Sequence, residues 1–449
     1  MVETVQPALA LNGTITLPPD KSISHRSVLF ASLADKASAI HNYSSAADPE
    51  STVQCMRQLG VRIDKDGSDI VVHGVGRSGL KSPEDPLDCG NSGTTMRLLS
   101  GIVAGAGIKA TLIGDESLSG RTMKRIIDPL RSMGAVIEAT DDEYAPIKIM
   151  PHNGIKPMRY PLPIASAQLK SCVLLAGLFG RSATEVIEQV LSRDHTERLL
   201  GLKSESFGQG KIISSSKADQ IPTQSYTIPA DFSAAAFWMT GAAIHGDSSL
   251  NLKNVGMNPS RTGALHILKQ MGASIEITNE RMQGREPVAD MEIRSSELKN
   301  IDIDPALIPN CIDELPILMV ALCFADGRSS ITGAEELRHK ETDRLSAMYD
   351  ILSAAGAEVE LRPDGIVIQG SPDFTPNVSE FESHHDHRMA MPQLFFLRGL
   401  RSLQQFWMLN ARLYLTLNSG HICRTYPISV RPTAQSWNNY HVKLTTGER

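Results

Sequence analysis

A recurring pattern of apolar and polar positions runs through most of the chain. In each copy a helix-like run ends at a glycine, and a short stretch of alternating apolar and polar residues follows it. A glycine suits the left-handed cap that closes many helices, and the alternation is typical of a half-buried strand. Four clear copies are centred on Gly60, Gly134, Gly272 and Gly356, and a weaker copy on Gly201.

The spacing of these glycines predicts an α/β fold built from a duplicated unit. They lie 74, 67, 71 and 84 residues apart, which is longer than the roughly 20–50 residues of solenoid repeats. The alternative is a chance recurrence of helix, glycine and strand, which is common in α/β proteins. A sixth copy would fall near residue 430, where the sequence Ile-Ser-Val-Arg-Pro offers no such glycine. We therefore expect the sixth repeat to be lost or altered.

The composition is typical of a globular protein of two or three domains. A chain of 449 residues exceeds one small core, and 41% hydrophobic with 21% charged residues excludes a disordered or membrane protein. Its six cysteines form no CxxC pair, and the N-terminus lacks a signal pattern. We therefore expect a reducing, cytoplasmic location and no membrane association.

The net charge of −6 divides unevenly along the chain. Residues 392–449 carry seven Lys or Arg and one acidic residue, or +6, so the first 391 residues carry −12. An acidic body argues against a nucleic-acid partner, because phosphate contacts need a clustered basic surface. The net charge of residues 392–449 therefore has the opposite sign to that of the rest of the chain.

Basic residues nevertheless stand at turns or helix starts in both halves of the acidic body. They are Lys21, Arg26, Arg121, Arg193, Lys340, Arg344 and Arg388. Each motif alone is explained as well by an ordinary helix cap or a salt-bridged surface helix. Together they predict a site for a polyanionic small molecule, with Asp313 and Glu341 available for proton transfer. Lys340 and Arg344, four residues apart, are expected on one helical face.

Two further patterns bear on cofactors. Three histidines lie within residues 384–387, but they cannot all converge from one helix face, so we expect no metal. No Walker A or GxGxxG motif accompanies the basic residues, and we expect no cofactor.

From about residue 11 to residue 391 the motifs resemble, in order, those of the enolpyruvyl transferases, and within them the 5-enolpyruvylshikimate-3-phosphate synthase family. The most specific segments are residues 19–26, 192–197, 336–344 and 386–391, supported by 257–263 and 312–314. The resemblance implies a two-lobe inside-out α/β barrel of six βαβαββ repeats whose lobes close on substrate. One lobe would join residues 1–20 to 232–391, the other would be 21–231, and 392–449 would be an atypical tail.

The resemblance also implies a reaction and its residues. The enolpyruvyl group of phosphoenolpyruvate would pass to the 5-hydroxyl of shikimate 3-phosphate with release of phosphate, a step of aromatic amino-acid biosynthesis. The implied catalytic residues are Asp313, Lys21 and Glu341. Those implied to bind shikimate 3-phosphate are Lys21, Ser22, Arg26, Ser166, Ala167, Gln168, Arg193, Asp313 and Lys340. Those implied to bind phosphoenolpyruvate are Lys21, Asn91, Gly93, Arg121, Gln168, Arg344 and Arg388.

Further expectations follow from the family. The resemblance implies a monomer that is a target of the inhibitor glyphosate. Gly93 stands where tolerant members carry alanine, so sensitivity is expected. Thr122 replaces the proline of the family's Arg-Pro-Met, which affects how Arg121 is positioned.

Residues after Met391 depart from the family pattern, and their codons suggest why. Trp and Met have one codon each, so residues 406–410, Phe-Trp-Met-Leu-Asn, can be read one frame over. The shifted codons give Leu-Asp-(Ala or Val)-(Glu, Gln, Lys or stop), and residues 415–419 permit Ser-Tyr-Pro-Lys-Phe. A similar pattern occurs in the family's last repeat. We hypothesise that the reading frame shifts just after Met391.

Two other functions remain open. An enolpyruvyl transferase acting on UDP-N-acetylglucosamine would share the fold, although the Lys-Ser-x-Ser-His-Arg motif at residues 21–26 argues against it. An inactive, substrate-binding remnant is favoured by the tail and opposed by the intact charged motifs.

Overall fold

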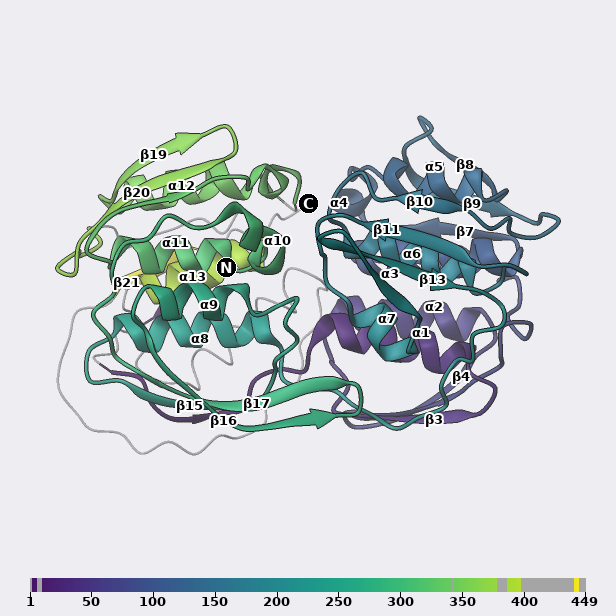
Figure 1. Cartoon of the computed structure of the whole chain (residues 1–449), viewed down its shortest axis with the longest axis horizontal. Helices are drawn as coiled ribbons and strands as arrows, with labels where there is room; N and C mark the ends of the chain where they lie inside the picture. Colours follow the sequence, from purple (N-terminus) through teal and green to yellow (C-terminus); the bar gives the residue numbers. More distant parts are fainter. Residues whose placement is uncertain (1, 6–9, 341, 378–385, 397–439, 444–449) are drawn as a thin grey trace. The chain divides into compact units, whose positions relative to one another are not determined.

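The computed structural model describes residues 2–5, 10–340, 342–377, 386–396 and 440–443. It has the α/β architecture that the sequence predicts, with several mixed sheets (Figure 1). Contacts divide the chain into two compact units. The first unit comprises Met1–Pro18, Ala230–Arg281 and the described part of Pro287–Arg449, and the second comprises Pro19–Pro229 and Met282–Glu286.

The second unit contains three four-stranded sheets with one shared strand order. In each, a short edge strand runs parallel to its neighbour, and two antiparallel strands complete the sheet. The first sheet is β14 (Tyr226–Thr227), β3 (Ala37–His41), β5 (Asp69–His73) and β4 (Arg62–Asp66). The second is β6 (Leu87–Asp88), β7 (Ala110–Ile113), β9 (Tyr144–Met150) and β8 (Val136–Thr140). The third is β10 (Arg159–Pro161), β11 (Thr184–Glu188), β13 (Gly210–Ser215) and β12 (Ser204–Phe207).

The first unit repeats the same order in one sheet and part of it in another. The complete sheet is β2 (Asn12–Ile15), β15 (Ser249–Gly256), β17 (Glu286–Arg294) and β16 (Ser274–Gln283). The three-stranded sheet is β18 (Gly327–Ile331), β20 (Gly365–Gly370) and β19 (Glu358–Arg362). Two parallel bridges, from Lys299 to Asp326 and from Asp302 to Ser330, lie beside β18 in the position of the edge strand. Separately, β1 (Val2–Val5) pairs with β21 (Tyr440–Lys443).

The chain passes between units after Pro18 and after Pro229, and again at the two ends of the short segment Met282–Glu286. In the second unit the Asp20 amide donates to the Pro229 carbonyl at 2.8 Å. In the first unit the Asp231 amide donates to the Pro18 carbonyl at 2.8 Å. The sheet of β3 therefore takes its edge strand β14 from far along the chain, as the sheet of β15 takes β2.

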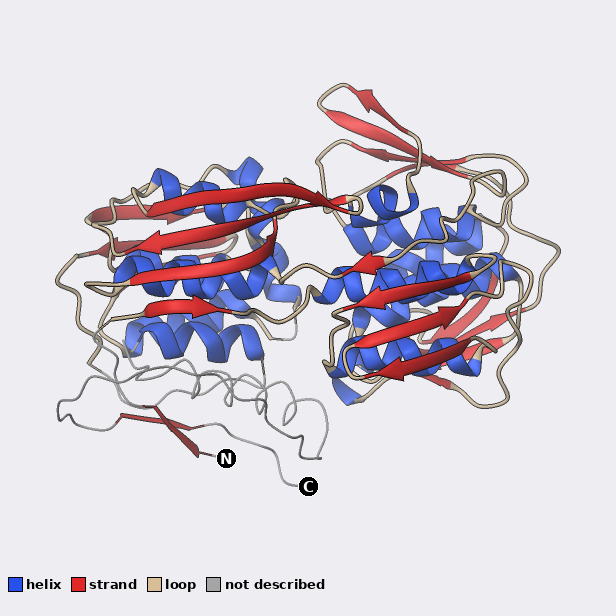
Figure 2. Ribbon diagram, turned by 90° about the horizontal axis from the view of Figure 1, so that it is seen from below, coloured by secondary structure: helices blue, strands red, loops and turns tan. Residues whose placement is uncertain are grey.

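Helices pack against the inner faces of these sheets (Figure 2). In the second unit they are α1 (Lys21–Leu33), α2 (Ala47–Gln58), α3 (Gly93–Ala106), α4 (Glu116–Ser119), α5 (Lys124–Ser132), α6 (Ala167–Gly177) and α7 (His195–Leu200). In the first unit they are α8 (Phe232–Ile244), α9 (Gly263–Gln270), α10 (Ile308–Cys311), α11 (Leu315–Cys323), α12 (Arg344–Ala354) and α13 (His387–Phe396), with 3₁₀ turns at Pro305–Leu307 and Glu335–His339. Helices α3, α6, α8 and α11 are buried on nearly all sides, as expected of internal helices.

The repeat glycines confirm the pattern read from the sequence. Gly60, Gly134, Gly272 and Gly356 have φ of +92°, +96°, +95° and +88°, and Gly201 has +67°. After each glycine the next amide donates to the carbonyl five residues earlier, which is the Schellman closure of a helix end. Residues that carry a side chain rarely adopt such a φ, so these positions require glycine.

The sixth repeat is described only in part. Helix α13 packs against α8, α11 and α12 in the first unit. Residues 397–439, which include the expected position of a sixth glycine, lie outside the described residues. Among the described helices, none is long and apolar enough to span a membrane alone; Pro305–Cys311 and Leu315–Cys323 meet that criterion only as a pair bent by 119°.

Candidate active site

The start of helix α1 forms the first cluster of the second unit. Asp20 caps the helix, because its Oδ1 accepts the Ile23 amide at 2.8 Å. The Lys21 ammonium, on the first residue of the helix, forms an ion pair with Asp48 Oδ2 of α2 at 2.9 Å. The two side chains are 23% and 16% exposed. A cation is therefore held at the positive end of a 13-residue helix, where anions bind readily.

One turn further along α1, the Arg26 side chain is buried in a hydrogen-bond network. Its Nε donates to Thr196 Oγ1 at 2.8 Å, its Nη2 to Ser171 Oγ at 3.0 Å, and its Nη1 to the Ser22 carbonyl at 3.1 Å. Three helices, α1, α6 and α7, thus meet at one guanidinium, which fixes its plane.

Arg26 lies among charged groups of both signs. Burial lowers the pKa of Arg26 to about 10; the Glu197 and Asp20 carboxylates oppose this shift, and the neighbouring Arg193 adds to it. Two guanidinium groups that repel each other bind phosphate well, because each presents paired N–H donors. The structure therefore brings Arg193 and Arg26 into one electrostatic environment, together with the Glu197, Asp20 and Glu286 carboxylates.

Helix α6 presents its N-terminus in the same unit. Ser166 caps it, with Oγ accepting the Leu169 amide at 3.4 Å, and Ala167 is its first residue. Gln168 follows, and its Oε1 accepts from Arg97 Nη1 at 2.6 Å while its Nε2 donates to Thr94 Oγ1 at 3.0 Å. The amide is thereby oriented by two residues of α3.

The turn before α3 holds the next predicted residues. Asn91 Oδ1 accepts from Arg121 Nη2 at 2.7 Å, and Arg121 Nη2 also donates to Ser117 Oγ at 3.0 Å. A Cβ placed on Gly93 would lie 2.9 Å from Arg97 Nη1 and 3.8 Å from Arg121 Nη1. Gly93 therefore makes room for the Arg97 guanidinium beside the helix start. Asn91 and Ser117 hold Arg121 although Thr122 replaces proline.

In the first unit, Asp313 lies between two arginines. Its Oδ1 accepts from Arg344 Nη1 at 3.5 Å, and its Oδ2 lies 3.6 Å from Arg388 Nη2. Arg388 Nη1 also donates to the Asp313 carbonyl at 2.9 Å. Arg344 is 1% exposed and forms a bidentate pair with Asp386 at 2.8 and 3.4 Å. One carboxylate is thus oriented by two cations that themselves suit phosphate or carboxylate ligands.

The prediction for Lys340 and Arg344 was wrong in its geometry. The turn at Glu335–His339 is 3₁₀, Lys340 is extended with φ −89° and ψ −156°, and α12 begins only at Arg344. Asp343 caps α12 by accepting the Ser346 amide at 3.1 Å, so the helix cannot extend back to Lys340. The Lys340 ammonium instead pairs with Glu336 at 3.3 Å. Glu341, predicted to be catalytic, lies outside the described residues.

Three residues of these clusters were not singled out from the sequence: Asp48, Arg97 and Asp386. Arg97 lies four residues after Gly93, one helical turn away, which is a usable signal. Asp386 stands two residues before Arg388 at a helix start, a capping position. Asp48 is 27 residues from Lys21 and has no local signal.

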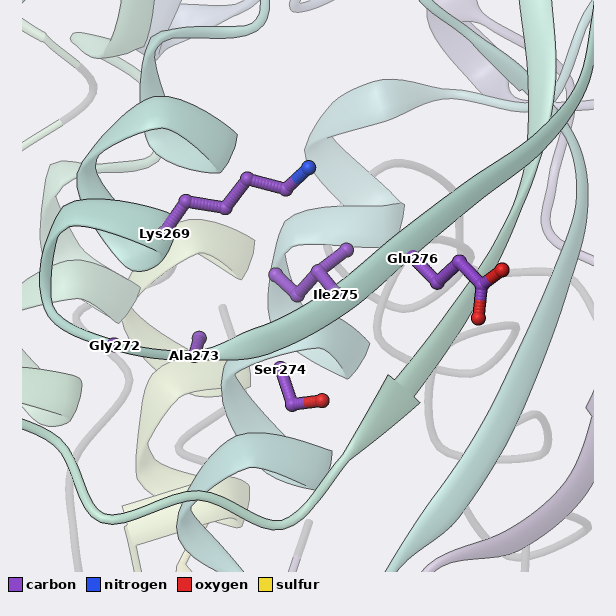
Figure 3. A pocket seen from close by; sticks show the side chains of 6 residues that line it. All are labelled: Lys269, Gly272, Ala273, Ser274, Ile275 and Glu276. Carbon is purple, nitrogen blue, oxygen red and sulfur yellow. The ribbon is translucent and has the colours of Figure 1, made fainter.

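Two other features are separate from these clusters. An open recess on the first unit is lined by Lys269, Gly272, Ala273, Ser274, Ile275 and Glu276 (Figure 3). It contains none of the predicted site residues. Within the part of the chain that the structure describes, no three His, Cys, Asp or Glu side chains form a metal cluster; His384 and His385 lie outside that part.

Comparison with known proteins identifies close relatives. A family model described as EPSP synthase (3-phosphoshikimate 1-carboxyvinyltransferase) matches residues 5–427. The 3-phosphoshikimate 1-carboxyvinyltransferase of Salinibacter ruber is 50% identical over 396 residues, covering 87% of this chain and 91% of the relative. The Hydrogenovibrio crunogenus protein of the same name is 44% identical over 414 residues, covering 89% and 91%.

Solved structures agree with these matches. EPSP synthase from Acinetobacter baumannii superposes with a TM-score of 0.80 at 39% identity, covering 92% of this chain and 96% of that one. The enolpyruvyl transferase NikO from Streptomyces tendae has a TM-score of 0.69 at 16% identity, covering 89% and 91%. The second likeness shows the shared fold.

Proposed function

This chain belongs to the EPSP synthase (3-phosphoshikimate 1-carboxyvinyltransferase) family, and from that premise we propose that it transfers the enolpyruvyl group of phosphoenolpyruvate to the 5-hydroxyl of shikimate 3-phosphate, releasing phosphate. The observation that carries the proposal is the Asp313 carboxylate oriented by Arg344 and Arg388. A base beside two anion-binding groups suits a reaction between a hydroxyl and a phosphorylated acid.

Residues of each unit are assigned separately to the two substrates. In the second unit, the proposed ligands of shikimate 3-phosphate are Lys21, Ser22, Arg26, Ser166, Ala167, Gln168 and Arg193. Those for phosphoenolpyruvate in that unit are Lys21, Asn91, Gly93, Arg121 and Gln168. In the first unit, Asp313 and Lys340 are assigned to shikimate 3-phosphate, and Arg344 and Arg388 to phosphoenolpyruvate. Forked guanidinium donors suit the phosphate and carboxylate groups of both molecules.

The chemistry needs proton transfers in both directions. C3 of phosphoenolpyruvate gains a proton, C2 becomes cationic, and the 5-hydroxyl oxygen attacks C2 while its proton passes to Asp313. The tetrahedral adduct then loses a proton from C3 and expels phosphate, which leaves the enolpyruvyl ether. Lys21, with Glu341, is proposed to carry protons to and from the adduct.

Finer properties are proposed on the same basis. We expect a cytoplasmic monomer. We also expect glyphosate to inhibit it, because Gly93 carries no methyl group that would intrude on the inhibitor. The comparisons favour a shikimate 3-phosphate substrate over UDP-N-acetylglucosamine. The comparisons do not favour an inactive, substrate-binding form.

Phosphate release by the purified chain tests the proposal. Release should require both phosphoenolpyruvate and shikimate 3-phosphate. Asp313→Asn should lower kcat by about 10²–10⁴, the usual range for a lost general base, while the Kd of shikimate 3-phosphate changes little. A chain that binds both substrates without releasing phosphate is the inactive form, and a chain that binds neither contradicts the proposal.

A further inference from the structure

A buried ion cluster lies beneath the proposed shikimate 3-phosphate residues of the second unit. The Lys170 ammonium on α6 is fully buried and contacts Glu188 Oε2 at 2.9 Å and Glu197 Oε1 at 2.7 Å. The two carboxylates are 1% and 7% exposed. Three ionisable groups without solvent are costly to bury, and apolar side chains often replace such groups without loss of stability. The cluster therefore invites a functional explanation.

The cluster fixes the connection between β11 and α7. Glu188 ends β11, and its Oε1 accepts both the amide and the hydroxyl of Ser192. The Lys170 ammonium also contacts the Ser192 carbonyl at 3.5 Å. One lysine on α6 thus ties down the residue immediately before Arg193.

The far side of the same cluster reaches Arg26. Glu197 follows Thr196, whose hydroxyl accepts from Arg26 Nε at 2.8 Å and is 2.6 Å from Ser171 Oγ. Ser171 is the residue after Lys170 on α6. Lys170 and Ser171 therefore hold two successive residues of α7, one by charge and one by hydrogen bonding. The position of Arg26 therefore depends on how α7 is aligned along α6.

We propose that Lys170 is a positioning residue for the phosphate end of shikimate 3-phosphate. By holding Glu188 and Glu197 together, it sets the distance between Arg193, on the β11–α7 connection, and Arg26, on α1. This inference rests on the proposed function, because it assumes that these two arginines bind the substrate phosphate. Lys170 itself touches no substrate.

Substitution separates this role from a purely structural one. Lys170→Met leaves two buried carboxylates without their cation, so Lys170→Met/Glu197→Gln is made as well to reduce the uncompensated charge. Both should weaken shikimate 3-phosphate binding by about tenfold or more, the size expected when a charge-assisted contact is misplaced. Lys170→Arg keeps the cation and should recover most of the affinity.

Arg77 offers a matched control in the same unit. Its guanidinium donates to the carbonyls of Leu178, Asp219 and Lys217 at 3.0, 3.1 and 2.9 Å. It therefore anchors the C-terminal end of α6 and a following loop, at residues other than the three that Arg26 contacts. Arg77→Met should lower the free energy of unfolding without changing the Kd of shikimate 3-phosphate.

The measurements are calorimetric titration with shikimate 3-phosphate and urea unfolding of the full chain and each variant. If the wild-type chain binds and the folded double variant binds equally well, the role of Lys170 is contradicted while the proposed function stands. The role of Lys170 is also contradicted if Lys170→Arg binds shikimate 3-phosphate no better than Lys170→Met does. If the wild-type chain does not bind shikimate 3-phosphate, the proposed function and this inference both fail.

Discussion

Arg97 Nη1 donates to Gln168 Oε1 at 2.6 Å, which joins the second turn of α3 to the first turn of α6. Arg97 Nη2 also donates to the Thr122 carbonyl at 3.2 Å, beside Arg121. The same Nη1 is the atom nearest to a Cβ built on Gly93. A methyl group at position 93 would therefore act on Gln168 through Arg97, as well as on any ligand at the start of α3.

We predict that Gly93→Ala weakens glyphosate inhibition and raises the KM of phosphoenolpyruvate. At 2.9 Å the new methyl group and Arg97 Nη1 cannot both keep their positions, and Arg97 must release Gln168 or shift. A lost charge-assisted hydrogen bond corresponds to about a tenfold effect. Steady-state kinetics with and without glyphosate measure both changes.

Gly120→Ala provides the control for this substitution. Gly120 immediately precedes Arg121, but its Cβ would meet only backbone oxygens at 3.7 Å, and its φ of −81° suits alanine. Its kinetics should match the wild-type chain. An unchanged inhibition constant for Gly93→Ala would contradict the role assigned to Gly93.

A second prediction concerns His25, which is buried between Lys21 and Arg26 on α1. Its Nδ1 lies 2.7 Å from Thr52 Oγ1. Burial lowers the pKa of His25 from 6.5 to about 3, opposed by Asp48 and assisted by Lys21 and Arg26. His25 is therefore protonated below about pH 6.5 in the unfolded chain, but only below about pH 3 in the folded chain.

Folding stability is therefore highest with respect to His25 above pH 6.5, and it decreases as the pH falls from 6.5 towards 3. The loss approaches about 1.4 kcal/mol per pH unit, or about 2 kcal/mol between pH 6.5 and 4.5. Between pH 6.5 and 4.5, the free energy of unfolding of His25→Asn, measured by urea unfolding, should therefore fall by about 2 kcal/mol less than that of the wild-type chain. Replacing the exposed His266 by Asn controls for removal of a histidine. Equal pH slopes for the wild-type chain and His25→Asn would refute the prediction.

The sequence predicted the repeats well because their signal is local. Each Schellman closure needs one glycine at one position, and Gly134 with φ +96° illustrates a requirement that no other residue meets easily. The strand order within a repeat could be inferred only from the family resemblance. The exchange of edge strands β2 and β14 involves residues more than 180 positions apart, for which no local pattern exists.

The site was predicted less completely for a related reason. Motifs identified the residues that carry charge, such as Lys21 and Arg344, but they did not identify the partners that hold them. Asp48 and Lys170 act through tertiary contacts, and an acidic residue or a lysine inside a helix has no distinguishing local signal. The helix start at Arg344 was misplaced because Asp343 is the N-cap, and the charge-rich sequence around it does not distinguish a cap from a surface charge.

A third prediction concerns Asp386, whose carboxylate makes a bidentate pair with Arg344 although both side chains are 1% exposed. Asp386→Asn removes the nearer of two charges opposite a buried guanidinium, since Asp313 stays 3.5 Å from Arg344. The cost is at most the roughly 3–5 kcal/mol of an uncompensated buried charge. The variant should unfold at lower urea concentration and bind phosphoenolpyruvate more weakly, because Arg344 loses its orientation. The exposed pair Arg328–Glu360 in the same unit is the control, since Glu360→Gln should change stability far less. Equal losses for the two variants would contradict the importance of burial at Asp386.

The last prediction concerns the gene rather than a side chain. If the reading frame shifts just after Met391, independent sequencing will find a single-nucleotide difference at that point. The corrected frame will then continue through Leu-Asp and Ser-Tyr-Pro motifs in place of residues 406–410 and 415–419. Met391 lies within α13 (His387–Phe396), so the corrected frame would also replace the second half of that helix before it continues into the sixth repeat.

A completed repeat buries apolar surface of the first unit, and burial of this kind is the main source of folding free energy. We therefore expect the corrected chain to unfold at higher temperature than the 449-residue chain, and to release phosphate at least about tenfold faster if the sixth repeat adds about 1.4 kcal/mol to transition-state stabilisation. Both proteins are compared by calorimetry and by the phosphate assay. Independent reads that preserve the present frame would end the hypothesis, and full activity of the present chain would show that residues 392–449 support the fold as they stand.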